Sequence, residues 1–120
     1  MQLFKEYIIH ASRFLPKLPE EHICSKMHGH TFYIKLDLEG NLNPENDFVI
    51  DFYDLDEIFN THIGVKIDHK ILNEVKGLES PTTEILTKWI WDNLKSHLGV
   101  LSAVTVREGS TYGCTYSGNN

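Results

Sequence analysis

Alternation of apolar and polar residues predicts two strands in the first third of the chain. Residues 31–38 place apolar side chains on one face and polar ones on the other, as in a half-buried strand. Residues 2–10 carry apolar side chains at both parities, so we predict an earlier strand with both faces partly covered. Residues 14–27 lie between them and are too many for a tight hairpin, and long loops in small domains often carry function.

Two later segments repeat their apolar residues at helical spacing. In the first, Asp51 is the predicted N-cap and the apolar stripe runs to about residue 63. In the second, residues 80–84 have the composition of a helix start, and the period continues to about residue 98 before Gly99. Residues 64–80 have no regular period and are predicted to be irregular.

Strand character returns over residues 101–108 and 112–117. The predicted order is therefore β-β-α-α-β-β in a single domain, residues 1–120. Paired strands on either side of paired helices predict an α+β fold, in which a four-stranded antiparallel sheet carries two helices on one face.

The net charge and the hydropathy of the chain argue against several classes of function. A net charge of −6 argues against nucleic acid as the main partner. No apolar run approaches the roughly 20 residues that a membrane span needs, and the N-terminal residues lack the apolar segment of a signal peptide. We therefore expect a cytoplasmic protein with Cys24 and Cys114 as free thiols, the latter packed on its strand.

Three side chains suited to metal or proton chemistry, Cys24, His28 and His30, precede the strand 31–38. Extending the strand parity backwards puts both imidazoles on the apolar face, and paired His residues at i, i+2 on a strand often hold a metal. The alternative is a buried His pair with ordinary hydrogen bonds and an inert Cys. Near a metal, Cys24 would serve either as a thiolate base or as a further ligand, and the spacing does not separate these uses.

Three more titratable residues are candidates for a site. Glu108 continues the buried parity of its strand, so it either meets water at the strand end or points into a pocket. In a pocket it would accept two parallel hydrogen bonds from a planar N–H pair, such as an amino-pyrimidine edge. Asp68 and His69 are either a base with its orienting group, or a turn cap beside a His that reaches the site.

On these residues the chain resembles the 6-pyruvoyl-tetrahydropterin synthase family, and within it the bacterial branch that makes 6-carboxy-5,6,7,8-tetrahydropterin for queuosine biosynthesis. The resemblance runs nearly end to end, and its specific element is Cys-x-x-x-His-Gly-His at residues 24–30. Other shared elements are Leu15-Pro16, Ile50-Asp51-Phe52, Asp68-His69, Pro81-Thr82-x-Glu84, Lys88-Trp89-Ile90-Trp91 and Val106-x-Glu108.

The resemblance implies a carbon–carbon lyase that converts 7,8-dihydroneopterin triphosphate to 6-carboxytetrahydropterin, acetaldehyde and triphosphate. It also implies the tunnelling fold, a four-stranded sheet with two helices, assembled as a homohexamer of two trimers whose sheets close into barrels. The alternatives are the triphosphate-eliminating synthase of the same family and a non-catalytic pterin-binding protein. The roles implied for this chain are zinc binding by His28 and His30, general base catalysis by Cys24, a proton relay of Asp68 and His69, and pterin anchoring by Glu108.

One position departs from the family pattern. The third zinc ligand of the family is a His shortly before Leu-Pro, and ungapped alignment from Leu15-Pro16 puts Arg13 at that position. Arg stays protonated and does not bind a metal. Strand alternation predicts that Arg13 points into the same interior as His28 and His30.

Several outcomes follow from this departure. His10 or His22 completes the zinc site, and His10 does so only if a bulge re-aims it. Otherwise the metal binds weakly, or the guanidinium of Arg13 occupies the place of the metal.

Overall fold

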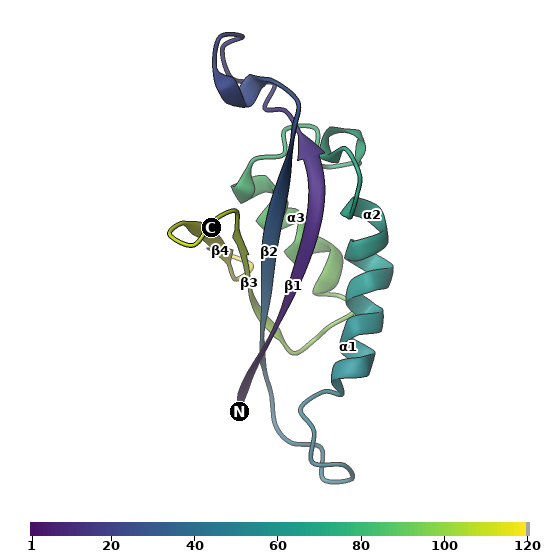
Figure 1. Ribbon diagram of the computed structural model, residues 1–120. Helices are drawn as coiled ribbons and strands as arrows, with labels where there is room; N and C mark the ends of the chain where they lie inside the picture. The colour runs from purple at the N-terminus through teal and green to yellow at the C-terminus, as the bar shows by residue number, and fades with distance from the viewer. Residues whose placement is uncertain (120) are drawn as a thin grey trace.

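The computed structural model describes residues 1–119 and has the predicted order of elements (Figure 1). Its strands are β1 (Gln2–Arg13), β2 (His28–Glu39), β3 (Leu101–Arg107) and β4 (Gly113–Tyr116). They form one antiparallel sheet in the order β1-β2-β3-β4. The predicted α+β fold with a four-stranded antiparallel sheet is confirmed.

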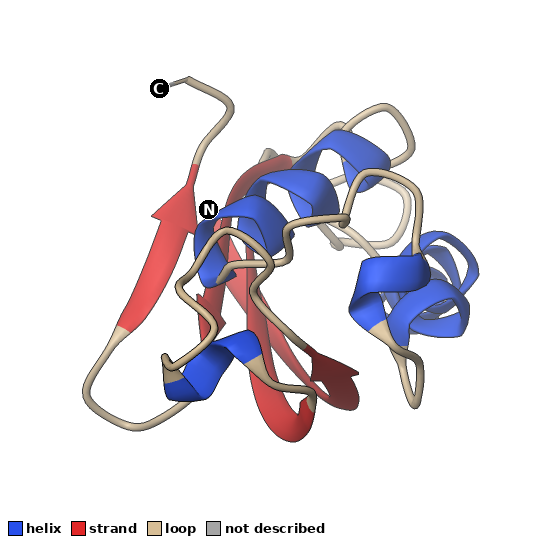
Figure 2. Ribbon diagram, turned by 90° about the horizontal axis from the view of Figure 1, so that it is seen from above, coloured by secondary structure: helices blue, strands red, loops and turns tan. Residues whose placement is uncertain are grey.

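The helical layer consists of two main segments. The first comprises α1 (Phe52–Phe59), the π-helical η2 (Asn60–Gly64) and α2 (Val65–Ile67), which follow one another without a break. The second is α3 (Thr83–Leu94). Two short 3-10 helices, η1 (Ile23–Ser25) and η3 (Leu72–Glu74), lie in the connections. Viewed along the β1–β2 hairpin, α3 and the α1–α2 segment lie beside each other against the sheet (Figure 2).

The hydrophobic core lies between this helical layer and one face of the sheet. On β2 the residues of one parity are fully buried, as the alternation predicted. These residues are Phe32, Ile34, Leu36 and Leu38. They pack against the helical stripe, which contributes Leu55, Phe59, Ile63, Ile67, Leu86, Ile90 and Leu94. Because one parity of the strands faces the helices, the opposite face of the sheet is left open in the single chain.

Several predicted boundaries were wrong. β1 continues past residue 10, because its backbone pairs with β2 as far as Arg13. The first helical segment extends past residue 63 to Ile67 through η2. α3 stops before residue 98, where the Nζ of Lys95 donates to carbonyls of Gly99 and Leu101 and ties the turn towards β3.

The prediction that both faces of the first strand are partly covered is also wrong for the single chain, in which the outer face is mostly exposed. Phe4 and Ile8, on the outer face of β1, are 60% and 58% exposed. Among residues 1–119, no helix combines the length and the apolar character that crossing a bilayer requires.

The molecule is elongated, with principal extents of 57 × 25 × 24 Å. The loop after β1 extends from one end of the hairpin, and the turn after β2 extends from the other end (Figure 1). Each end of the hairpin therefore lies close to the surface, and the candidate site residues His28 and His30 are at the end that carries the first loop.

Candidate functional site

The hairpin places Arg13, His28 and His30 on the core side of the sheet at its loop end. Arg13 pairs with His28 in the strand register, and Ala11 pairs with His30. The register runs from Gln2 to Arg13 without a shift, so simple alternation determines where these side chains point. The two imidazole ring centroids are 4.3 Å apart. The three side chains therefore share one face of the hairpin, as alternation predicted, although His28 at the end of the strand stays exposed.

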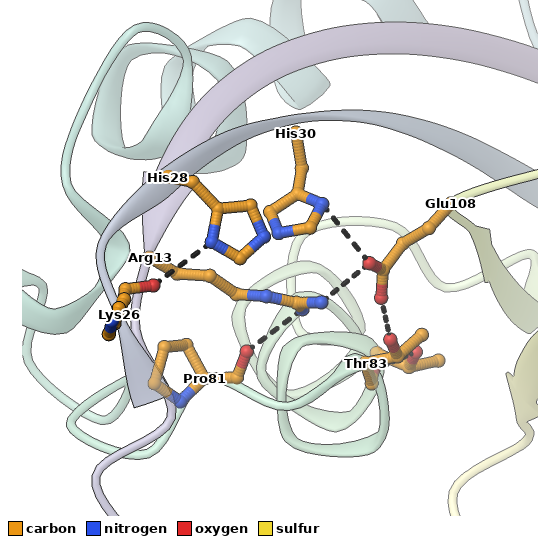
Figure 3. A network of polar contacts seen from close by, with 8 residues as sticks. Arg13, Lys26, His28, His30, Pro81, Thr83 and Glu108 are labelled. Atoms are coloured by element: carbon orange, nitrogen blue, oxygen red, sulfur yellow. Dashed lines mark hydrogen bonds and ion pairs between the residues drawn. The ribbon is translucent and has the colours of Figure 1, made fainter. Parts of the chain in front are cut away.

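Arg13 is buried and has partners for its charge. The residue is 6% exposed, and its Nη2 lies 2.5 Å from Oε1 of Glu108 (Figure 3). Its Nη1 donates to the carbonyl oxygen of Pro81 at 3.1 Å. The guanidinium carbon also lies 5.2 Å from the ring centroid of Phe32, within cation–π range. An ion pair with this geometry holds the side chain in one place.

Glu108 directly follows β3, and its side chain is 8% exposed. One carboxylate oxygen faces Arg13, and the other accepts a hydrogen bond from the hydroxyl of Thr83 (Figure 3). Burial alone would raise the pKa of Glu108. The hydrogen bonds from Arg13 and Thr83 and the charge of Arg13 outweigh this effect, so the pKa lies below its usual value. Glu108 is therefore an ionised, buried carboxylate, and each of its two oxygens already has a donor within the chain.

His30 has a defined orientation at the edge of this network. Its Nδ1 lies 3.5 Å from Oε1 of Glu108, and this carboxylate contact favours the tautomer with the proton on Nδ1 and the lone pair on Nε2. Burial and then the charge of Arg13 lower the pKa of His30, and the opposing effect of Glu108 is smaller. Within residues 1–119, Nε2 is buried and has no hydrogen-bond partner. The neutral imidazole thus keeps one acceptor free.

His28 is the more exposed member of the pair. Its Nδ1 lies 2.9 Å from the carbonyl oxygen of Lys26 and donates to it, which leaves the lone pair on Nε2. Two imidazoles with free Nε2 atoms would suit a metal, but a catalytic zinc takes three protein ligands. No group of three His, Cys, Asp or Glu residues that could hold a metal occurs among residues 1–119. The residues present therefore do not fit a three-ligand zinc centre.

Neither of the spare imidazoles completes that centre within the chain. His10 has the opposite parity, and no bulge interrupts the pairing of β1 with β2. Its Nδ1 lies 3.1 Å from Oγ1 of Thr31 on the outer face. His22 accepts the backbone N–H of Cys24 on its Nδ1, at 3.0 Å, and so caps the start of η1.

Asp68 and His69 form a turn that is docked on the edge of β1. The backbone N–H of His69 donates to the carbonyl oxygen of His10 at 2.6 Å, and the N–H of His10 donates to Oδ1 of Asp68 at 3.0 Å. The same carboxylate oxygen lies 3.1 Å from Nδ1 of His69. The Asp68 carboxylate and the His69 imidazole therefore do face each other, and Asp68 also secures the turn.

The backbone of this turn is strained. His69 has a φ of +61°, a left-handed conformation that non-glycine residues rarely adopt. Burial would raise the pKa of Asp68, but the hydrogen bond from His10 and the proximity of His69 outweigh it and lower the pKa. Strained residues with charge-assisted partners cluster at functional sites.

A pocket of about 480 Å³ lies beside His69 on the outer face of the hairpin, and His30 borders it from β2, although its imidazole points to the opposite, core side. Residues that line it include His10, Ser12, Gly29, His30, Thr31 and His69. Cys24 is not among the residues that line this pocket. It lies in η1, on the loop beyond the end of the hairpin, with a half-buried free thiol. Within one chain, the structure therefore does not bring Cys24 together with the Asp68–His69 pair.

Sequence reasoning missed the role of Thr83. Thr82 is the N-cap of α3, since its hydroxyl accepts the N–H of Ile85 at 3.1 Å. Only one of two successive threonines serves as the cap, and that fact could have marked Thr83 as free for another partner. Thr83 also lines a second pocket of about 320 Å³, together with Cys114. Cys114, predicted to pack, is only half-buried there.

Comparison with known proteins relates the whole chain to one family. The family model described as 6-pyruvoyl tetrahydropterin synthase matches residues 2–119. The chain is 33% identical to a 6-carboxy-5,6,7,8-tetrahydropterin synthase of Synechocystis sp. over 120 residues, which covers 95% of the chain and 91% of that protein. It is 29% identical to the 6-carboxy-5,6,7,8-tetrahydropterin synthase of Bacillus subtilis, covering 96% of the chain and 84% of that protein.

The fold matches a solved structure equally well. The 6-pyruvoyl tetrahydropterin synthase of Caenorhabditis elegans superposes with a TM-score of 0.88, covering 99% of this chain and 96% of that chain at 24% identity. At this identity the match concerns the fold.

Proposed function

The chain belongs to the 6-pyruvoyl tetrahydropterin synthase family, and from this premise we propose that it is a carbon–carbon lyase acting on the side chain of a dihydropterin. The proposed substrate is 7,8-dihydroneopterin triphosphate, and the proposed products are 6-carboxy-5,6,7,8-tetrahydropterin, acetaldehyde and triphosphate. Two relatives with the matching name, similar over nearly the full chain, support this choice over the triphosphate-eliminating reaction. The product would then serve queuosine biosynthesis.

The observation that carries the proposal is the Asp68–His69 pair. Its carboxylate holds the imidazole at 3.1 Å, and the His69 side chain is 75% exposed beside the 480 Å³ pocket. A base that is oriented by a carboxylate and accessible from a pocket suits proton transfer to and from a substrate. The left-handed backbone of His69 directs this side chain at a local cost in strain. His69 therefore moves protons around the bond that is cleaved.

Cys24 is assigned the second proton-transfer role. A thiolate is an effective base when its surroundings stabilise the charge. The loop that carries Cys24 extends from the same end of the hairpin as His28 and His30 (Figure 1). Because Cys24 lies apart from His69 in one chain, a substrate or a neighbouring copy of the chain has to bridge them.

Glu108 is assigned the role of pterin anchor. The carboxylate is ionised and buried, which suits recognition of a planar pair of N–H donors. It already binds Arg13 and Thr83, so the pterin has to share it or displace the weaker, neutral hydroxyl donor. Calorimetry of Glu108→Gln with a dihydropterin tests this role, and an unchanged Kd would refute it.

We further propose that the protein is a homo-oligomer, with the hexamer of two trimers as the expected form. Within residues 1–119 no strand lies beyond β4 in the sheet. The outer face of β1 exposes the apolar side chains of Phe4 and Ile8. Open edges and exposed apolar side chains are normally covered in folded proteins. Closure of several sheets into a barrel would cover both.

Product analysis tests the proposed activity. The purified protein is incubated with 7,8-dihydroneopterin triphosphate, and the products are separated by chromatography. Acetaldehyde together with 6-carboxytetrahydropterin supports the proposal. A 6-pyruvoyl product identifies the triphosphate-eliminating reaction instead. Substrate that binds in calorimetry but is recovered unchanged identifies a non-catalytic pterin-binding protein.

A further inference from the structure

We propose that Arg13 is the resident cation of this site, so that its guanidinium takes the place of a divalent metal and Glu108 serves as its counterion. The proposal concerns the point where the chain departs from the zinc-binding pattern expected of its family. It rests on the proposed function only for what the cation does during turnover. Its test needs no pterin.

The first argument is position. Arg13 lies directly opposite His28 in the strand register, on the buried face. Its side chain passes close to both imidazole rings and ends at Glu108 (Figure 3). The positive charge is thus located beside the two imidazoles that would otherwise bind a metal. A surface arginine that merely replaced a ligand would turn out to solvent, whereas this residue is only 6% exposed.

The second argument is that the guanidinium is fixed in place. Nη2 lies 2.5 Å from Glu108, Nη1 lies 3.1 Å from the Pro81 carbonyl oxygen, and the ring of Phe32 covers the guanidinium carbon at 5.2 Å. Thr83 holds the other oxygen of Glu108 and so fixes the counterion. Moving Arg13 out would leave Glu108 buried without a cation, which is strongly unfavourable. The arginine therefore does not swing aside to admit a metal.

The third argument is chemical. A guanidinium keeps its proton and has no lone pair to offer a metal. Its charge repels a divalent cation at close range. The two remaining imidazoles fall short of the three protein ligands that a catalytic zinc takes. A site with two ligands and an adjacent fixed cation has little affinity for zinc.

A fixed guanidinium still supplies part of what a metal would supply. Its charge and N–H groups stabilise an oxygen that gains negative charge during a reaction. It offers no exchangeable coordination position, so the proton transfers fall to side chains such as His69. This arrangement leaves the neutral His30 imidazole, with its free buried Nε2, as an acceptor beside the cation.

A competitive zinc titration against a chromophoric chelator at neutral pH tests the inference. We compare the wild-type protein with Arg13→His, which adds an imidazole and removes the repulsive charge in one step. Wild type is expected to show no stoichiometric high-affinity zinc. Arg13→His is expected to bind zinc at least about tenfold more tightly, since even outer-shell changes alter metal affinity by about 10–100-fold.

Two control variants separate the site from adventitious binding. Glu45→His adds an exposed imidazole to the turn at the opposite end of the hairpin, and it is expected to leave zinc affinity unchanged. His97→Ala removes a surface imidazole from the stacked His62–His97 pair and controls for weak binding there. The inference is overturned if wild type binds one zinc per chain tightly, a result that stands even if Arg13→His fails to fold. It is also overturned if a folded Arg13→His gains no more affinity than Glu45→His.

Discussion

Arg13 and Glu108, which are 95 residues apart in the chain, form a buried ion pair with Nη2 and Oε1 2.5 Å apart. Their side chains are 7% and 8% exposed, so water screens this contact poorly. The pair joins the end of β1 to the residue after β3 and contacts the start of α3 through Pro81 and Thr83. It therefore links the sheet to the helical layer at the candidate site.

The Arg13–Glu108 ion pair predicts that the free energy of unfolding depends strongly on each of the two side chains. Arg13→Met or Glu108→Leu alone should lower the free energy of unfolding by about 3–5 kcal/mol, because each leaves an uncompensated buried charge. The double variant should lose less than the sum of the two. Urea unfolding followed by circular dichroism measures all four proteins. Additive losses in the double variant would show that the two side chains do not interact.

The stacked imidazoles of His62 and His97 predict a pH effect remote from the site. Their ring centroids are 3.7 Å apart with planes 9° from parallel. Partial burial and the nearby charges of His97 and Lys66 lower the pKa of His62. The unfolded chain then binds the proton more readily, so stability falls as pH drops from about 6.5 through the lower folded pKa.

Removal of the partner ring should relieve this shift. In His97→Ala the pKa of His62 should rise towards its ordinary value, and the loss of stability in that pH window should shrink. NMR titration of the imidazole C–H resonances checks the pKa directly. An unchanged titration curve for His62 would mean that the stacking has no influence on its protonation.

We predict that a substitution in the Asp68–His69 pair lowers kcat but leaves dihydropterin affinity nearly unchanged. Asp68→Asn removes the charge that orients and stabilises the His69 imidazole, so kcat should fall about 100-fold or more. Dihydropterin affinity should change little, because neither group is assigned to the ring. Asp92→Asn, which breaks only the exposed pair with Lys88, is the matched control. Equal effects on kcat in both variants would remove Asp68 from the mechanism.

We predict that the two free thiols, Cys24 and Cys114, differ in their importance for activity. Cys24→Ala should abolish turnover while leaving the fold and pterin binding intact, because the thiol is on a loop and outside the hydrophobic core. Cys114→Ala, which removes the other half-buried free thiol, should retain activity. Steady-state rates of the two variants and far-UV spectra provide the comparison. Near-wild-type activity of Cys24→Ala would refute its assignment as a base.

Local sequence patterns predicted the fold better than they predicted the contacts within the candidate site. Alternation along β1 and β2 is a local property, so it correctly placed Arg13, His28 and His30 on the same face of the hairpin. The parity of β3 left open whether Glu108 meets water or points into a pocket, and the structure buries its side chain. Strand pairing also carried β1 beyond residue 10, which no local signal indicated, because an extended chain gains hydrogen bonds wherever its partner continues.

The contacts between these residues were beyond sequence reasoning. The Arg13–Glu108 pair depends on how the end of β1 meets the end of β3, and no local period records that meeting. The left-handed φ of His69 accompanies a hydrogen bond to His10 on another element, which the local sequence does not record. The prediction of a bulge-assisted ligand at His10 required an irregularity that the uninterrupted register of β1 and β2 does not contain.

The most direct test of the central claim is product analysis of the wild-type protein with 7,8-dihydroneopterin triphosphate, before and after exhaustive dialysis against a chelator. We predict acetaldehyde and 6-carboxytetrahydropterin at the same rate in both samples, because Arg13 supplies the fixed positive charge. Product formation that the chelator abolishes and added zinc restores would contradict the role of Arg13 and leave the lyase activity standing. Absence of product in both samples would contradict the lyase activity itself.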